Sequence, residues 1–346
     1  MIYDIAILGA GASGLMAASF LKDRSVCIID SNSYIGAKIK VSGGAKCNIT
    51  NKYMNSSYYL GDQDLIQSTL KNFSQKELLN FLNQNSIYPK LDEKIVKGTF
   101  FCASSKDVND MFKKLTYHCK YKLNTNILDI EYKDNLFKII TSKGSIIAKK
   151  VIVATGGLSY SSLGASDIGY KIAQKFGHTI KRCDPALVGF TVQKDQFWFK
   201  KLSGLSLDVA IKVDNKTIEG KMLFTHKGCS GPAILTSSLY WSRGSFSIDF
   251  SPYKNSYLPK RFRQAIKEIS NFDIHNYTMS PAGTFGFSKA EVTKGGVATN
   301  EISKTFESKL QKNLYFIGEV LDITGQLGGY NFQWCFSSAV TCAKVI

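Results

Sequence analysis

The sequence predicts an α/β protein in which a Rossmann-like dinucleotide-binding domain is interrupted by an inserted domain, mainly antiparallel β with helices. Three observations support this. An apolar run near the N-terminus passes through a glycine-rich turn into a helical pattern, a second apolar run ends in an aspartate, and the middle of the chain alternates as antiparallel strands do. A chain of 346 residues also exceeds what one core usually supports. We expect residues 1–185 and 292–346 to form the first domain and residues 186–291 to form an inserted substrate domain.

The glycine-rich turn is the most specific pattern in the chain. Residues 3–8 form a mostly apolar strand, Gly9, Gly11 and Gly14 follow in the spacing Gly-x-Gly-x-x-Gly, and residues 15–21 continue as an apolar helix. In such a turn the first glycine allows the reversal, the second lets backbone approach a pyrophosphate, and the third lets the helix pack on the strand. The helix N-terminus adds free N–H groups for the phosphates.

The next strand supplies an acid where a dinucleotide site needs one. Residues 25–29 are largely apolar and end at Asp30, whose carboxylate can accept hydrogen bonds from a ribose diol. A Gly-x-Gly-x-x-Gly spacing alone also occurs in ordinary surface turns, which is the alternative interpretation. The strand before the turn, the helix after it and the acid together favour dinucleotide binding.

Composition fits a soluble globular enzyme, with 44% hydrophobic and 21% charged residues. The eight cysteines include no Cys-x-x-Cys pair and the four histidines are dispersed, so neither a zinc site nor a redox dithiol is indicated, and we expect no metal. No run of about eighteen apolar residues occurs, and the N-terminus lacks the cationic start of a signal peptide. We therefore expect a cytoplasmic protein without a membrane partner.

The net charge of +17 allows two interpretations. A nucleic acid or another anionic partner would explain it. However, the lysines are spread along the chain, often beside Asn and Ile, which favours a general compositional bias. The compact basic cluster is Lys260-Arg261-Phe262-Arg263, in a stretch with a helical pattern. Nucleic-acid binding is therefore kept as the less favoured alternative.

The segment from Ile35 to Asn51 concentrates small residues, amides and hydroxyls beside lysines, which suits a loop against a polar, negatively charged ligand. With the glycine-rich opening, it resembles the flavoprotein family called YhiN or BaiN-like, also labelled aminoacetone-oxidase-like FAD-binding enzymes. Members carry Lys-x-x-x-Ser-Gly-Gly-Gly-Arg-Cys-Asn-x-Thr-Asn, much like residues 38–51. Here Ala45 and Lys46 replace the usual Gly and Arg, so a bidentate arginine contact would be lost or become a point-charge contact.

Further segments carry secondary-structure signals and family resemblance. The patterns predict helices at 65–73, 75–84 with Ser74 as cap, and 104–115, and strands at 122–130, 136–141, 145–147 and 150–157, the last ending in small residues. In flavoproteins with two dinucleotide folds, a segment like Ala154-Thr155-Gly156 returns the chain to the cofactor. A second complete Gly-x-Gly-x-x-Gly is absent, so NADH or NADPH, if it is the electron donor, is expected to dock transiently.

The inserted domain is predicted from alternation at 205–213, 217–224 and 245–250 and from a helix at 258–269. Its block from Leu223 to Leu235 resembles the family's most distinctive segment outside the FAD domain. A Gly-Pro helix start in this block could bind an anion. His226, in the same block, is either a proton donor or a structural residue.

The C-terminal part also resembles the family, at residues 290–297, 305–309, 314–322 and 325–338, although the helical part before residue 290 is shorter than usual. In related flavoproteins such a block places an acid on the ribityl chain and a helix N-terminus at the flavin pyrimidine ring, where the dipole stabilises the reduced flavin. We expect the flavin ring to lie between Tyr330 and Asn331, the Ser42–Asn48 loop and the inserted domain.

The resemblance implies an FAD-dependent oxidoreductase of the two-dinucleotide-fold flavoprotein type. It would act on an unidentified small organic substrate by hydride transfer through flavin, and the alternative is an RNA-binding or tRNA-modifying flavoprotein. His226 and Tyr330 are the candidates for proton exchange. The candidate cofactor-binding residues are Gly9, Gly11, Ala12, Ser13, Gly14, Asp30, Ser31, Lys38, Ser42, Gly43, Ile127, Thr155, Gly156, Gly318, Glu319, Asp322, Gly328, Gly329, Asn331 and Phe332.

Overall fold

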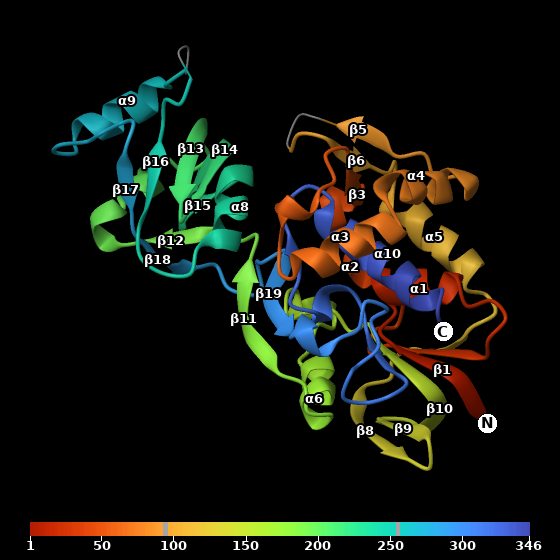
Figure 1. Cartoon of the computed structure of the whole chain (residues 1–346). Coiled ribbons are helices and arrows are strands. Elements are labelled where there is room, and N and C mark those ends of the chain that lie inside the picture. The colour runs from red at the N-terminus through yellow and green to blue at the C-terminus, as the bar shows by residue number, and fades with distance from the viewer. Residues whose placement is uncertain (93–95, 254–256) are drawn as a thin grey trace. The chain divides into compact units, whose positions relative to one another are not determined.

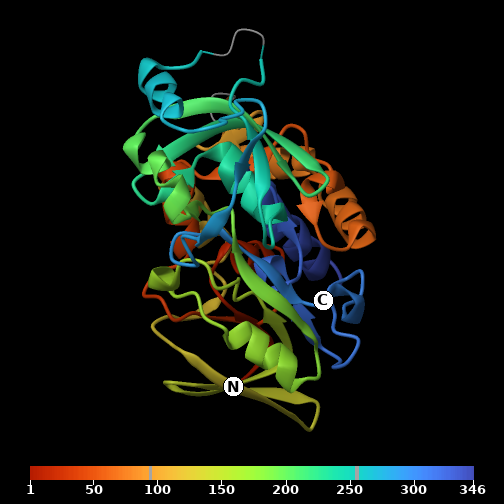
Figure 2. The same ribbon diagram turned by 90° about the vertical axis from the view of Figure 1, so that its left-hand side faces the viewer.

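The computed structural model describes residues 1–92, 96–253 and 257–346. It divides into two compact units (Figure 1). The first joins Met1–Asp184 to Thr293–Ile346, and the second is Pro185–Val292. The chain leaves the first unit through β11 (Ile180–Ala186) and returns through β19 (Val292–Val297), and these two strands pair with each other (Figure 1, Figure 2).

The first unit is built on a sheet with strand order β7-β2-β1-β10-β9-β8, to which β20 adds by pairing with β10. The bounds are β1 (Ile2–Leu8), β2 (Val26–Ile29), β7 (Lys120–Lys122), β8 (Ile127–Lys133), β9 (Leu136–Thr141), β10 (Gly144–Val153) and β20 (Leu314–Phe316). Strands β7, β2, β1, β10 and β20 run parallel, whereas β9 pairs antiparallel with both β8 and β10. This confirms the predicted α/β class.

Helices cover this sheet and small additional sheets complete the unit (Figure 1). The helices are α1 (Ala12–Ser19), α2 (Ala37–Val41), α3 (Gln63–Asn72), α4 (Gln75–Gln84), α5 (Ser105–Leu115), α6 (Ile168–Lys175) and α10 (Tyr330–Ala343). The small sheets comprise β3 (Asn48–Asn51), β6 (Thr99–Phe101) and β5 (Lys90–Asp92), and β21 (Thr324–Gly325) with β4 (Tyr59–Leu60). Helix α10 contacts α1 and α3, so the end of the chain covers the opening helix.

Local signals placed several helix starts correctly. The Ser74 hydroxyl accepts from the Glu77 N–H at 3.4 Å, and the Glu77 carboxylate accepts from the Ser74 N–H at 2.6 Å, which forms a capping box at the start of α4. Ser104 likewise accepts from the Lys106 N–H at the start of α5. Helices α4 and α5 thus confirm the predictions at 75–84 and 104–115. These helices could be predicted because their caps lie within the local sequence.

Two strand predictions in the first unit were wrong. Residues 122–130 do not form one strand, because the chain breaks between β7 and β8, where Asn124 has a φ of +51°. The Asn124 N–H donates to the Asn32 carbonyl, so this break lies against the end of β2. Residues 145–147 and 150–153 belong to one strand, since β9 pairs with the first half of β10 and β20 pairs with the second half.

The second unit is an antiparallel sheet with strand order β17-β16-β13-β14-β15-β12-β18. Its strands are β12 (Phe190–Val192), β13 (Ser206–Val213), β14 (Lys216–Thr225), β15 (Gly228–Ser230), β16 (Phe246–Asp249), β17 (Tyr277–Met279) and β18 (Pro281–Thr284), and its helices are α7 (Trp198–Lys201), α8 (Pro232–Tyr240) and α9 (Lys260–Lys267). The core is strongly aromatic: Trp198 contacts the rings of Phe199, Phe250 and Phe262. The alternation seen in the sequence thus gives the expected antiparallel sheet.

Candidate functional site

The glycine-rich turn connects β1 to α1. Gly9 has a φ of +114°, and a Cβ there would lie 2.4 Å from the Ala154 oxygen. A Cβ on Gly14 would lie 2.0 Å from the Gly9 carbonyl oxygen. Gly11 differs, because no heavy atom of the described residues outside its neighbours lies within 4 Å of where its Cβ would be, and no described side chain caps the helix that it begins. The fold therefore requires Gly9 and Gly14, whereas Gly11 borders open space beside the helix N-terminus.

Asp30 follows β2 and is held against this turn. Its Oδ2 accepts from the Ala10 N–H at 2.7 Å, and its Oδ1 accepts from the Asn32 N–H at 2.8 Å and from the Asn32 amide at 3.0 Å. The amide of Asn32 also donates to the Leu163 carbonyl at 3.0 Å. A carboxylate oxygen has two acceptor positions, so Oδ2 can accept one more donor, such as a ribose hydroxyl. Sequence reasoning missed Asn32, although it lies only two residues after the predicted acid.

A buried hydroxyl without a partner lies where β10 returns to this turn. Thr155 follows the strand, and its Oγ1 finds no hydrogen-bond partner among the described residues. A Cβ on Gly169 would lie 2.1 Å from that oxygen, which shows how closely α6 approaches. Leaving a hydroxyl buried and unpaired costs about 1–3 kcal/mol, so Thr155 is suited to meet a polar group that the protein itself does not supply.

The partly buried carboxylate of Glu319 connects four segments that are distant in the sequence. Lys38 Nζ lies 2.7 Å from Glu319 Oε2, and the Thr293 N–H donates to Glu319 Oε1 at 2.9 Å. The Thr293 hydroxyl in turn accepts from the N–H groups of Leu158 at 2.8 Å and Ser159 at 3.2 Å. Lys38 and Glu319 were predicted separately as cofactor residues, but here they neutralise each other. Thr293 was not predicted, because its role depends on contacts between segments far apart in the chain.

The turn before α10 is shaped by two asparagines. The Asn51 amide donates to the Gly328 carbonyl at 3.0 Å, and Asn331 Oδ1 accepts from the Gly325 N–H at 2.8 Å. Gly329, with a φ of +92°, precedes α10 directly, and a Cβ there would lie 2.4 Å from the Thr50 oxygen. No side chain caps the N-terminus of α10 in the described structure. The positive end of the α10 dipole would therefore favour an electronegative group, as would that of α1.

The chain matches the family model described as HI0933-like protein Rossmann domain over residues 3–345. It belongs to this family. It is 33% identical to the ribosomal RNA dihydrouridine synthase of Escherichia coli K12 over 99% of this chain and 97% of that one. It is 35% identical to the Haemophilus influenzae protein of the same name over 98% and 97%, and 28% identical to the 3-dehydro-bile acid delta(4,6)-reductase of Clostridium scindens over 98% of each.

Solved structures support the fold. The chain superposes on a quinol fumarate reductase FrdA of E. coli with a TM-score of 0.57 and 13% identity, over 100% of this chain and 70% of the other. A 3-ketosteroid-delta4-(5alpha)-dehydrogenase of Rhodococcus jostii gives a TM-score of 0.52 and 11% identity, over 99% and 96%. Family membership makes the protein an FAD-dependent oxidoreductase, which confirms the predicted fold, family and enzyme class. No described helix is long and apolar enough to cross a membrane.

The residues of the first unit fit the family's FAD. All the candidate cofactor-binding residues lie in this unit. The open space at Gly11, the remaining acceptor position on Asp30 and the unpaired Thr155 hydroxyl are features that a bound dinucleotide would use. Gly318 packs closely against α1, since a Cβ at this position would lie 2.6 Å from the Ser13 hydroxyl. Burial raises the pKa of the Asp322 carboxyl, and the charge of Lys181 opposes this rise.

The Ser42–Cys47 loop has an unusual backbone. Gly43, Gly44 and Ala45 all have positive φ, at +55°, +64° and +67°. Glycine adopts this conformation without strain, whereas an alanine pays about 1–2 kcal/mol, so Ala45 is strained where the family usually has glycine. Lys46 is exposed, and hydrogen bonding with Cys102 together with burial holds the pKa of the Cys47 thiol well above its ordinary value.

The two residues predicted to exchange protons lie in different units. Tyr330 is only 4% exposed, stacks on Tyr58 with ring centroids 5.0 Å apart, and meets Tyr59 edge-on at 5.8 Å. This packing accounts for Tyr330 without a catalytic role. His226 is exposed in the turn between β14 and β15. Both assignments stay predictions. Among the described residues no group of His, Cys, Asp or Glu could hold a metal ion.

Proposed function

We propose that this protein reduces the C5=C6 double bond of a uridine in ribosomal RNA. The observation that carries the proposal is identity of 33% and 35%, over almost the whole chain, to two proteins named ribosomal RNA dihydrouridine synthase. The net charge of +17 supports a polyanionic substrate. These two observations favour an RNA substrate, the alternative in the sequence analysis, over a small organic substrate.

The proposed chemistry is shared by the different relatives. Uracil C5=C6 is conjugated to a carbonyl, and a Δ(4,6) bile acid carrying a 3-oxo group is also a conjugated enone. Reduction places a hydride on the carbon remote from the carbonyl and a proton on the adjacent carbon. FAD, when reduced and bound, supplies the hydride. A small enone is therefore the second candidate substrate, supported by the bile acid reductase at 28% identity.

The protein's own residues have three tasks in this proposal. The turn from Gly9 to Gly14 and Asp30 would hold the dinucleotide part of FAD, with Thr155 as a further polar contact. The uncapped N-terminus of α10 would favour negative charge at the reduced ring. The second unit would present the substrate, with His226 as the candidate that protonates the carbon next to the carbonyl.

The electron donor belongs to the same proposal. The sequence has one Gly-x-Gly-x-x-Gly turn, and FAD would occupy it. NADH or NADPH would then dock transiently, with a dissociation constant well above about 1 μM, the value that corresponds to about −8 kcal/mol. Anaerobic mixing with each nucleotide, followed by flavin absorbance, identifies the donor. Binding at about 1 μM or tighter would contradict transient docking.

The experiment that tests the function measures dihydrouridine directly. FAD-loaded protein, reduced nicotinamide and an unmodified ribosomal RNA transcript are incubated, and the digested nucleosides are analysed by mass spectrometry. We expect dihydrouridine with wild type, and about 100-fold less with His226→Ala at unchanged FAD content. If no dihydrouridine forms while a 3-oxo-4-ene steroid reoxidises the reduced flavin, the substrate is a small enone. Wild-type turnover in His226→Ala would make His226 structural.

A further inference from the structure

Helix α9 carries the compact basic cluster that the sequence analysis singled out. Lys260, Arg261, Arg263 and Lys267 are all exposed on this helix. Arg261 is engaged, because its guanidinium donates to the carbonyl oxygens of Ser203 and Lys201. No ion pair involves Arg263 or Lys267 within the described parts of the chain, whereas Glu268 beside them is paired with Lys201 at 3.0 Å. Arg263 and Lys267 are therefore among the cations of this helix that form no ion pair with a described residue.

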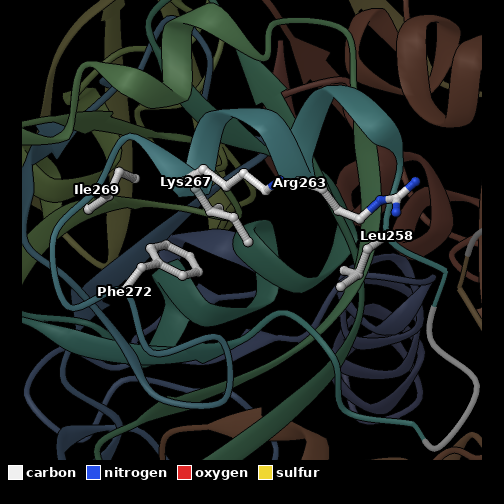
Figure 3. Close-up of a pocket in the computed structure, with 6 residues that line it drawn as sticks. Leu258, Arg263, Lys267, Ile269 and Phe272 are labelled. Atoms are coloured by element: carbon white, nitrogen blue, oxygen red, sulfur yellow. The ribbon is translucent and has the colours of Figure 1, made fainter.

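A depression of about 460 Å³ lies under these two cations. Its floor is apolar, formed by Leu258, Ile266, Ile269 and Phe272, and Arg263 and Lys267 complete its lining (Figure 3). In Figure 3 the Phe272 ring lies below α9, and the side chains of Arg263 and Lys267 project from that helix. An apolar floor with a cationic rim suits a ligand that has a flat or apolar part and also carries negative charge.

The aromatic floor is rigidly supported. Phe272 is half-buried, stacks on Tyr277 with centroids 5.1 Å apart, and meets Trp198 edge-on at 5.6 Å. The ring is therefore held in place before any ligand arrives. Proteins that bind single-stranded nucleic acids present aromatic side chains of this kind, because every base has a flat face that can stack on them.

A further cation and an exposed aromatic ring lie on and beside α7. Arg261 donates to the carbonyl of Lys201, the last residue of α7, and to that of Ser203, so the two helices are neighbours in the second unit. On α7, Lys200 Nζ lies 3.5 Å from the ring centre of Phe197, which is itself 43% exposed. Cations and at least partly exposed aromatic rings thus lie on or beside both helices.

We propose that this α7–α9 surface, comprising Phe197, Lys200, Arg263, Lys267 and Phe272, is a docking site for single-stranded RNA. An unpaired base enters the depression against Phe272, and Arg263 and Lys267 neutralise the flanking phosphates. The inference deepens the proposed function, on which it rests, because it assigns the part of the substrate domain that holds RNA outside the reacting base. Nothing in it depends on how the reacting uridine meets the flavin.

The test measures binding separately from catalysis. FAD-loaded full-length protein is titrated against fluorescein-labelled oligouridylate by anisotropy over a range of salt concentrations. Each phosphate contact to a single strand contributes about 0.7 to the log–log salt slope. The double variant Arg263→Ala with Lys267→Ala should therefore lower the slope by about 1.4 and weaken binding about 25-fold at 0.1 M salt. The control, Lys114→Ala with Lys120→Ala, removes two exposed lysines of the first unit and should bind like wild type.

A second variant tests the base pocket. Phe272→Leu keeps the floor apolar but removes the stacking surface, and we expect at least a fivefold loss of affinity at an unchanged salt slope. FAD content and thermal midpoint show that each variant is folded. Wild-type affinity and slope in the double variant would overturn the inference, as would loss of cholate binding without loss of oligouridylate binding, which would make the depression a small-molecule site. RNA binding through this surface without any dihydrouridine would instead refute the proposed function alone.

Discussion

Replacing Gly11 and Gly14 with alanine, one at a time, separates what the turn does for the fold from what it does for the cofactor. At Gly11 the added Cβ meets no atom within 4 Å, and the backbone, with φ −84° and ψ −168°, is open to alanine. Alanine restricts the unfolded chain, which stabilises the folded protein by about 0.4–1 kcal/mol. Alanine is also a poorer N-cap than glycine, which destabilises the folded protein by a similar amount. The stability of the FAD-free protein should therefore change by no more than about 0.5 kcal/mol.

FAD affinity should respond differently at this position. If the pyrophosphate lies against Gly11, the new methyl group pushes it away from the helix N–H groups and weakens at least one hydrogen bond to a charged acceptor, worth about 1.5–3 kcal/mol. That corresponds to roughly 10–150-fold weaker binding. At Gly14 the Cβ would lie 2.0 Å from the Gly9 oxygen and 3.2 Å from Ile7 Cγ2, so backbone must move and the FAD-free protein should lose about 1–3 kcal/mol or more.

The assay combines thermal unfolding of the flavin-free proteins with titration of FAD, followed by quenching of its fluorescence. We expect Gly11→Ala to alter only the titration and Gly14→Ala to alter both measurements. Wild-type FAD affinity in Gly11→Ala would show that the pyrophosphate does not lie on this turn. Equal destabilisation of the two FAD-free variants would refute the inference that a Cβ meets open space at Gly11 but occupied space at Gly14.

Three further predictions concern single residues. Asp30→Ala should weaken FAD retention by about 1–3 kcal/mol, measured as FAD bound after gel filtration, and unchanged affinity would remove Asp30 from the site. Thr155→Val removes a buried unpaired hydroxyl, so the FAD-free protein should be as stable as wild type or up to about 1 kcal/mol more stable, while FAD titration shows weaker binding; unchanged FAD affinity would exclude a cofactor contact. Burial lowers the pKa of His178, although Glu301 opposes this, so the unfolded state binds a proton more readily than the folded state. The stability that neutral His178 contributes above about pH 6.5 should therefore be lost as the pH falls, and the thermal midpoint should fall with it. An equal fall of the midpoint in His178→Gln would exclude His178 as the cause.

The parts of the fold that the sequence predicted well are those determined by neighbouring residues. The turn from Gly9 to Gly14 contains its own steric requirements, and the capping box of α4 lies within four residues. The break at Asn124 could not be predicted in this way, because it depends on where β7 meets β2. A run of apolar and polar residues indicates extended backbone but does not indicate which strand will be its partner.

The candidate site shows the same division. Asp30 was identified by its position after a strand, but the pairing of Lys38 with Glu319 joins residues 281 positions apart. Their charges suggested two separate cofactor contacts, whereas in the fold each is largely compensated by the other. Thr293 has no local pattern to mark it, since its importance comes from the three segments that its N–H and hydroxyl connect.

The interruption of the first unit has a consequence for synthesis. The second unit is one continuous stretch, so its sheet can close as soon as residue 292 has left the ribosome. The first unit must wait, because β20 completes the edge of β10 and α10 covers α1 only after the second unit has been made. Until then the apolar side of α1 and half of β10 lack their partners, with Trp334 and Phe336 still to arrive. The nascent chain thus carries a folded second unit beside an incomplete first unit, which is completed only by the segment that follows the second unit.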